Sequence, residues 1–297
     1  MQEDLTNTSS NGPVLDPGSM VALAEANGLT RMGLRPTIKD YIRQTWQQRV
    51  FMSSMATYRL RAQVEENRLG FAWFIIKPIL DSLIYGAIFG ILQGSSRPPD
   101  YVAYVVTGVF LFNFFTTSFS DGAQSIVSSR ILVQTLAFPR VTLPLSRVLQ
   151  DLYATLPSVA LLPFILMLRG HMPSFQWLLI IPLIFLLTLF NSGMALIAAR
   201  VTVHLRDLSQ LIPVISRLLF YTSGVLFNVD KIFESHPVII TVYNFHPLYQ
   251  ALCMARGVMM STDYPLHYWI DFSAWSIGVF ILGLIYFWAA EERYGSE

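Results

Sequence analysis

The chain has 297 residues, of which 53% are hydrophobic and 13% carry a charge. Because water-soluble domains carry about 25% charged residues, this composition excludes an ordinary soluble protein and predicts a membrane protein. The formal net charge of +1 gives no basic field for nucleic acid, and the single cysteine excludes an internal disulfide or a cysteine-based metal site.

Residues 1–36 are polar, acidic and rich in turn-forming residues. They have neither the basic start nor the apolar centre of a signal peptide. We therefore expect a disordered cytoplasmic tail.

Residues 37–68 predict an interfacial segment that begins with an amphipathic helix over 37–52. Apolar residues recur there at helical spacing, while basic residues lie largely off that stripe. Such a helix rests on the membrane with its aromatic side chains at headgroup level. The alternative is a surface helix of a small soluble domain. The apolar positions are Ile38, Tyr41, Ile42, Thr45, Trp46 and Val50, and the basic ones are Lys39, Arg43 and Arg49.

Residues 69–294 contain six apolar stretches separated by polar turns. A helix rises 1.5 Å per residue, so about 20 apolar residues cross the roughly 30 Å hydrocarbon core. The sequence therefore predicts an all-α polytopic membrane protein with a six-helix transmembrane domain. Its expected spans are 69–92, 101–120, 143–168, 175–199, 208–227 and 272–290.

The first span carries Lys77 and Asp81 one turn apart, so a local pair would limit the cost of both charges. Gly86 and Gly90 have the spacing that lets two helix backbones approach closely. This motif in one copy fits a dimer seam and incidental packing equally well.

Lysine and arginine are concentrated in the segments that a six-span model places on the same side as both termini. The positive-inside rule assigns that side to the cytoplasm. On this side the fourth and fifth spans meet at a brief charged joint, which predicts a tight turn in water. The joint contains Arg200, His204, Arg206 and Asp207.

The stretch 228–267 is too apolar for a free loop and too interrupted by proline and charge for a span. We expect two short helices within 237–260 that lie in or dip into the outer leaflet, because backbone at that depth must be hydrogen-bonded internally or line a cavity. The alternative is a disordered periplasmic loop.

Enzymatic and metal sites find no support in the sequence. None of the three lysines follows a glycine, so no phosphate-binding loop is present and the chain is not expected to hydrolyse ATP. The HLRD stretch at 204–207 lacks the downstream Asn of a kinase catalytic loop. The five histidines fall in separate loops, and no metal site is predicted.

Arg217 is expected close to the bilayer midplane, about 15 Å along a helix from Asp207. A charge there needs a partner or water. Two interpretations remain open: a structural pair with Asp81, Asp121 or Asp151, and contact with an anionic group in transit. Aromatic residues make up 13% of the chain, which suits an oligosaccharide passage, although such residues are common in any membrane protein.

Five segments together resemble the permease subunits of type-2 ABC exporters that move lipid-linked polysaccharide or teichoic acid across bacterial cytoplasmic membranes. The similarity covers about 38–294 and is greatest to actinobacterial galactan exporters. The segments are LGFAW (69–73) with Pro78 and YGAIFG (85–90), TGVFLFNFF (107–115), LAFPRVTLPLSRVLQDL (136–152), ARVTVHLRDLSQLIPVISRLLFYTSGVLF (199–227) and NFHPLYQAL (244–252).

The resemblance implies a homodimer that encloses a channel above two copies of a separate ATPase subunit, which would bind ATP and Mg while this chain binds no cofactor. It also implies three groups of site residues. ATPase coupling falls to Arg43, Trp46, Phe138, Pro139, Arg140, His204, Arg206 and Asp207; channel or glycan contact to Tyr85, Phe89, Phe112, Arg217 and Tyr221; and the outer-mouth gate to Asn244, His246, Pro247 and Tyr249.

The expected function is export of a polyprenyl-pyrophosphate-linked cell-surface polysaccharide. The expected location is the bacterial cytoplasmic membrane, crossed several times, with both termini in the cytoplasm. Two rivals remain open: a type-2 ABC permease for drugs or lipids, and a membrane-embedded transferase acting on lipid-linked sugars, for which the sequence offers no carboxylate pair.

Overall fold

The computed structural model describes residues 37–66, 68–94, 98, 100–135, 138–205 and 207–290. The predicted tail over 1–36 and Arg206 of the predicted joint lie outside these residues. All regular structure in the described residues is helical, which confirms the all-α prediction.

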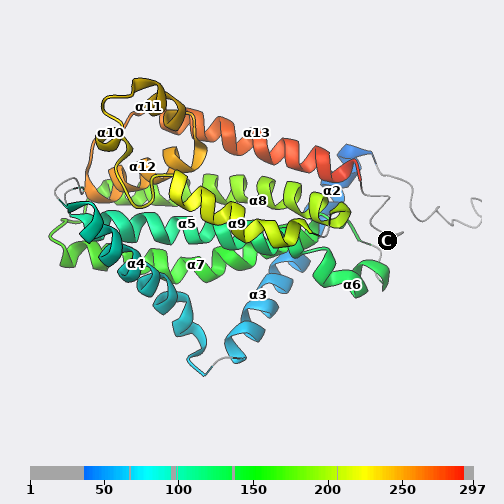
Figure 1. The fold of residues 1–297 in the computed structure, drawn as a ribbon. Helices are drawn as coiled ribbons and strands as arrows, with labels where there is room; N and C mark the ends of the chain where they lie inside the picture. Colours follow the sequence, from blue (N-terminus) through cyan, green and yellow to red (C-terminus); the bar gives the residue numbers. More distant parts are fainter. Residues whose placement is uncertain are drawn as a thin grey trace, which may run out of the picture. The chain divides into compact units, whose positions relative to one another are not determined.

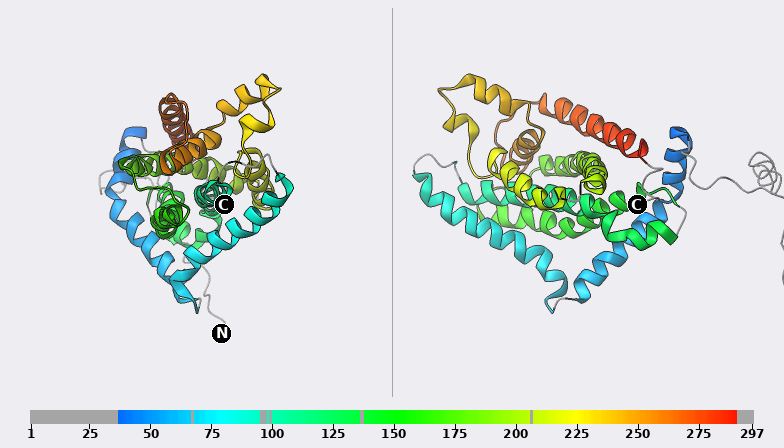
Figure 2. Two further views of the ribbon diagram at one scale, coloured as in Figure 1. Left: turned by 90° about the vertical axis from the view of Figure 1, so that its left-hand side faces the viewer. Right: turned by 45° about the vertical axis from the view of Figure 1, so that its right-hand side comes forward.

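The predicted amphipathic helix consists of two helices. Helix α2 (Ile38–Gln47) ends where Gln48 leaves helical geometry at φ −84° and ψ 9°, and α3 (Arg49–Glu65) continues in a new direction. Tyr41 is the buried anchor of α2, whereas Trp46 on the same helix is 68% exposed. Helix α3 leads to the 3₁₀ turn η1 (Gly70–Ala72) and to α4 (Trp73–Leu92). Figures 1 and 2 show α3 and α4 as the two arms of a V whose tip points away from the other helices, while its arms contact α7 and α5.

Helix α5 (Tyr101–Gln124) lies at the centre of the bundle and contacts α4, α7, α8, α9 and α12. Most of its side chains are buried, including the large rings of Phe110, Phe114 and Phe115. It extends one turn beyond the predicted span end at residue 120. After α5 the chain continues through η3 (Val127–Ser129) and α6 (Arg130–Thr135) to α7 (Thr142–Leu168).

Helices α8 (Ile180–His204) and α13 (Tyr268–Trp288) form the closest helix pair, and a 3₁₀ turn, η4 (Phe175–Leu179), precedes α8. A Cβ added to Gly193 would lie 2.5 Å from the backbone oxygen of Val279, and one added to Gly283 would lie 2.5 Å from the oxygen of Gly193. Close backbone approach therefore occurs at this crossing. A Cβ on Gly86, in the predicted small-residue motif of the first span, would meet nothing within 4 Å.

Five described helical segments are long and apolar enough to cross a membrane: Gly70–Leu92, Tyr101–Gln124, Thr142–Leu168, Phe175–His204 and Tyr268–Trp288. The fifth predicted span, 208–227, is wrong in its end point. Helix α9 covers only Leu208–Thr222, about 22 Å at 1.5 Å per residue. Gly224 takes φ +67°, a left-handed geometry that commonly ends helices. The six-span count stays a prediction.

Three short helices precede α13: α10 (Val229–Ile232), α11 (Pro237–Asn244) and α12 (Pro247–Met260). The two helices expected within 237–260 are therefore present, while their depth in the membrane stays a prediction. Prolines stand in the first turns of α11 and α12, where a missing N–H costs nothing. We call the two ends of the bundle the α12 end and the α2 end. The short helices α10, α11 and α12 lie at the first, and α2 and α6 lie at the second (Figure 1).

Candidate functional site

Five aromatic side chains from three helices form a cluster that we call the aromatic tier. The ring centroids of Tyr85 on α4 and Phe220 on α9 are 4.8 Å apart, and those of Phe112 on α5 and Phe220 are 5.2 Å apart. Phe89 and Tyr221 complete the cluster at 6.4 Å. The structure thus brings together all four aromatic residues predicted as channel contacts.

Phe220 is the central ring of this tier and was missed by the sequence reasoning. It contacts Tyr85, Phe112 and Tyr221, and only 7% of it is exposed. Its position directly beside Tyr221 in LLFYT was the available signal. Tyr221 is 42% exposed, so the tier presents aromatic surface outward from a packed base.

Arg217 lies one helical turn before Phe220 and Tyr221, and its side chain is exposed. None of the ion pairs within the described residues involves it. The predicted structural pairs with Asp81, Asp121 and Asp151 are not formed among the described residues. Asp81 Oδ2 accepts a hydrogen bond from Asn113 Nδ2 at 3.3 Å. The expected local pair between Lys77 and Asp81 is likewise not formed.

A second apolar cluster lies at the α2 end of the bundle. It buries Tyr41 of α2 with Val141, Leu196 of α8 and Phe287 of α13. The backbone N–H of Val141 donates to the Tyr41 hydroxyl oxygen at 3.3 Å. One core therefore connects α2, the start of α7 and the ends of α8 and α13, and we call it the coupling core.

The predicted ATPase-coupling residues lie on or beside the elements of the coupling core. The Phe138 ring packs 5.6 Å from that of Phe51 on α3, and Pro139 and Arg140 beside it are half-buried. The remaining described members are exposed: Arg43, Trp46, His204 and Asp207. Their role in coupling stays a prediction.

The predicted joint between the fourth and fifth spans is shorter than expected. Helix α8 continues through Arg200 to His204, so these two residues are helical. The Arg200 guanidinium lies 3.7 Å from the ring centroid of Tyr286, and its stem is thereby held against α13. The Nδ1 of His204 donates to the Arg200 carbonyl at 3.0 Å. Leu205 and Asp207 are the described residues between α8 and α9.

Arg59 of α3 ties the V to the bundle and was not singled out from the sequence. Its guanidinium donates to Ser129 Oγ at 2.9 Å and to Ser146 Oγ at 3.4 Å. Burial and the nearby positive charge of Arg147 lower the pKa of Arg59 to about 10, so it stays charged at neutral pH. Arg147 donates to Gln150 Oε1 at 3.3 Å rather than forming an ion pair with the Asp151 carboxylate.

At the α12 end, the non-helical backbone after α9 is held by side chains. The carbonyl oxygens of residues 224–227 accept hydrogen bonds from Gln93, Tyr101, Tyr104 and Arg256. Unpaired carbonyls at membrane depth are costly, so these donors allow the chain to leave helical geometry there. We call this arrangement the carbonyl clamp.

Arg256 is the centre of the carbonyl clamp. Its Nη1 donates to Gly224 O at 3.0 Å and its Nη2 to Val225 O at 2.7 Å, while Nε donates to Tyr104 O at 3.3 Å. The guanidinium lies 3.4 Å from the Tyr104 ring centroid, and the residue is 3% exposed. Carbonyl dipoles and an aromatic face therefore balance this buried charge.

The predicted gate residues shape the helices beside the carbonyl clamp. His246 Nδ1 accepts from the backbone N–H of Tyr249 at 3.2 Å, and Pro247 begins α12. Burial lowers the pKa of His246, which favours the neutral ring that this acceptor role needs. Asn244 Oδ1 accepts from the Tyr268 hydroxyl at 2.7 Å. These contacts fix the geometry, while the gating role stays a prediction.

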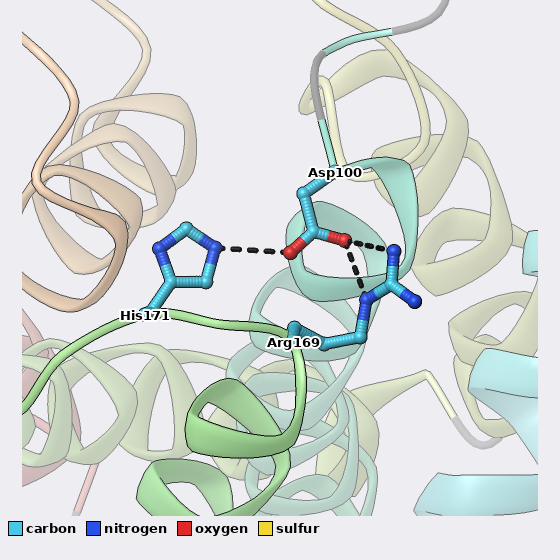
Figure 3. Close-up of polar contacts among 3 residues, drawn as sticks. All are labelled: Asp100, Arg169 and His171. Atoms are coloured by element: carbon cyan, nitrogen blue, oxygen red, sulfur yellow. Dashed lines mark hydrogen bonds and ion pairs between the residues drawn. The ribbon is translucent and has the colours of Figure 1, made fainter.

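Asp100 links two polar turns at the α12 end, as Figure 3 shows. Arg169 Nε and Nη2 lie 2.8 Å from Asp100 Oδ1, and His171 Nε2 lies 2.9 Å from Oδ2. Asp100 has φ 45°, a left-handed geometry that Asp tolerates better than most residues. The cluster joins the start of α5 to the end of α7 and borders a cavity of ≈ 300 Å³ that Arg256 also lines. In the described part of the chain, no group of three or more His, Cys, Asp or Glu could hold a metal.

The sequence matches a known protein family and several curated proteins. The family model described as ABC-2 type transporter matches residues 52–260, which include the aromatic tier and the carbonyl clamp. The chain belongs to the ABC-2 type transporter family. This assignment confirms the resemblance found in the sequence, and ABC-2 permease subunits are not themselves enzymes.

Curated relatives of this ABC-2 transporter include two O-antigen export system permease proteins, both named RfbA. The one from Klebsiella pneumoniae is 27% identical over 203 residues, which cover 68% of this chain and 77% of the relative. The one from Myxococcus xanthus is 27% identical over 192 residues, 64% of this chain and 73% of the relative. The polysialic acid transport protein KpsM of Escherichia coli is 20% identical over 187 residues, which cover 62% of this chain and 72% of the relative.

Proposed function

We propose that this chain is the channel-forming permease subunit of an ATP-driven exporter that carries a polyprenyl-pyrophosphate-linked polysaccharide across the bacterial cytoplasmic membrane. The printed names of its relatives support a polysaccharide cargo. The observation that carries the proposal is the aromatic tier, in which Tyr85, Phe89 and Tyr221 offer partly exposed ring surface on apolar helices. Sugar rings have apolar C–H faces that stack well on such surfaces.

The working transporter consists of two copies of this chain and two copies of a separate ATPase subunit, which binds ATP and Mg. Both termini of the permease face the cytoplasm. The ATPase contacts α2, the 138–140 segment and the turn after α8. Because the coupling core joins α2 to α7, α8 and α13, a push on any of these surface elements moves the helices together. The cargo polysaccharide that we propose is a galactan of the actinobacterial type.

Depletion in the native bacterium tests the cargo. We expect undecorated lipid-linked glycan to accumulate on the inner side of the membrane, measured by lipid extraction and mass spectrometry, while its synthesis continues. Affinity purification of the tagged chain from membranes should recover an ATPase subunit and a glycolipid. Normal surface glycan with accumulation of a phospholipid or drug would instead establish a permease for small amphiphiles. Glycosyl transfer by the isolated chain would establish a transferase.

Replacing Asp207 by Ala is expected to uncouple ATP hydrolysis from export. Asp207 is exposed in the turn after α8, where a partner subunit can contact its carboxylate, and it makes no ion pair within the described residues. We expect at least a fivefold fall in glycan exported per ATP hydrolysed by the reconstituted complex, with normal expression. Asp263→Ala, an exposed change at the α12 end, serves as the control. Equal coupling ratios in both variants would refute this contact.

A further inference from the structure

Arg217 lies on the exposed face of α9, and the sequence predicts that this position is close to the bilayer midplane. The stripe to which it belongs also includes Val214, Leu218 and Tyr221, all exposed in the single chain. Arg217 lies about 15 Å along the helix from Asp207, close to half of the roughly 30 Å hydrocarbon core. A guanidinium at that depth does not face acyl chains without a partner or water. The stripe therefore faces protein or a hydrated path.

The three acidic side chains predicted as partners of Arg217 are Asp81, Asp121 and Asp151. The Oδ2 atom of Asp151 is buried and has no hydrogen-bond partner among the described residues. Asp81 accepts from Asn113 at 3.3 Å. Asp121 and Asp151 both interact electrostatically with Arg147, and Asp151 is only 5% exposed. None of the three forms an ion pair with Arg217 among the described residues. The positive charge of Arg217 is thus left available at the surface of α9.

The surroundings of Arg217 combine polar groups and aromatic rings, as the binding of an amphiphilic anion requires. Tyr85 lies within electrostatic range of Arg217, Asp81 and Tyr221, so these polar groups occupy one region. Along α9, Arg217 precedes Phe220 and Tyr221 by one turn, and along α4, Asp81 precedes Tyr85 by one turn. A polar tier and the aromatic tier are therefore stacked along the same face, where the first can bind charge and the second can stack on sugar rings.

We propose that Arg217 is an oxyanion contact of the translocation path, binding a phosphate or carboxylate group of the cargo beside the aromatic tier. This inference rests on the proposed function and adds the chemical class of the group that is recognised. A guanidinium suits this role because its fork of N–H donors binds two oxygens of one phosphate or carboxylate at once.

The test compares Arg217→Gln and Arg217→Lys in the full complex with its ATPase, reconstituted in nanodiscs. The probes are farnesyl pyrophosphate and a tetramer of galacturonic acid. We expect Arg217→Gln to raise the Kd of at least one probe tenfold or more and to lower glycan export similarly. Arg217→Lys should give intermediate Kd values, because the ammonium group keeps the charge but not the planar fork of donors. Loss for farnesyl pyrophosphate assigns the phosphate of the lipid linker, and loss for the uronic acid assigns a sugar carboxylate.

Two further variants separate this role from a structural one. Lys231→Gln removes an exposed positive charge on α10, away from the stripe, and should leave both Kd values unchanged. Asp81→Asn should not reproduce the loss; if it does, and the double variant is no worse than either single one, Arg217 serves an ion pair and the proposal is overturned. Unchanged binding and export in Arg217→Gln would also overturn it. If the wild-type complex exports no glycan, the proposed function itself fails.

Discussion

Replacing Arg256 by Met is expected to lower the free energy of unfolding by about 4 kcal/mol, because it removes three charge-assisted hydrogen bonds at once. Met fills a similar volume, so the loss reflects the carbonyls of Gly224, Val225 and Tyr104 rather than a cavity. Steric trapping or SDS titration in bicelles measures it. Arg256→Lys should be intermediate, since one ammonium group cannot reproduce the planar fork.

Arg169→Met is the matched control for Arg256→Met. Arg169 also carries a full charge and pairs with Asp100 at 2.8 Å, but its side chain is 46% exposed. A pair in contact with solvent contributes about 1 kcal/mol or less. If the two methionine variants are equally stable, the carbonyl clamp does not hold the end of α9.

Gly193→Ala is expected to destabilise the protein by about 2 to 3 kcal/mol, a typical cost of overpacking against a rigid neighbour. The added Cβ would lie 2.5 Å from Val279 O and 2.6 Å from Phe280 N, both backbone atoms of α13. Backbone in a helix cannot rotate aside as a side chain can. Helices α8 and α13 must therefore separate, which a fall in thermal midpoint by fluorescence-detected size exclusion would report.

Gly278→Ala provides the control on the same helix pair. A Cβ at Gly278 meets nothing within 4 Å, so the change removes only the conformational cost of glycine in a helix. We expect stability equal to or up to about 1 kcal/mol above that of the wild type. A fall in Gly278→Ala as large as that in Gly193→Ala would show that glycine itself, rather than the close crossing, is responsible.

Hydropathy located the long helices because their apolar runs are local properties of the sequence. It misplaced the end of α9, since LFYTSGVLF is mostly apolar and contains no charged residue. The helix ends at Thr222 because Gly224 takes positive φ and because Arg256 and Tyr104, distant in sequence, supply donors to the following carbonyls. Such a stop depends on tertiary contacts that no local pattern contains.

The candidate site was predicted unevenly for the same reason. Aromatic residues stand out in any sequence, and Tyr85, Phe89, Phe112 and Tyr221 do converge in space. The role of Arg59 could not be predicted, because it depends on hydrogen bonds to Ser129 and Ser146. These serines are distant in sequence and come close to Arg59 only in the folded chain. Likewise, the sequence predicted Arg200 in a turn, but it lies in α8 and its guanidinium stacks on the Tyr286 ring of α13.

The two ends of α9 are held by different kinds of contact: hydrogen bonds of the carbonyl clamp at the C-terminal end, and apolar packing of Leu208 and Ile212 at the N-terminal end. Its far end is bound through residues 224–227 to α4, α5 and α12, whereas its near end follows the exposed turn at Asp207. With an arm of about 22 Å, a tilt of about 10° about the clamped pivot moves the near end by about 4 Å. If α9 pivots at the carbonyl clamp, Arg217 moves by an intermediate amount between the clamped end and the turn at Asp207.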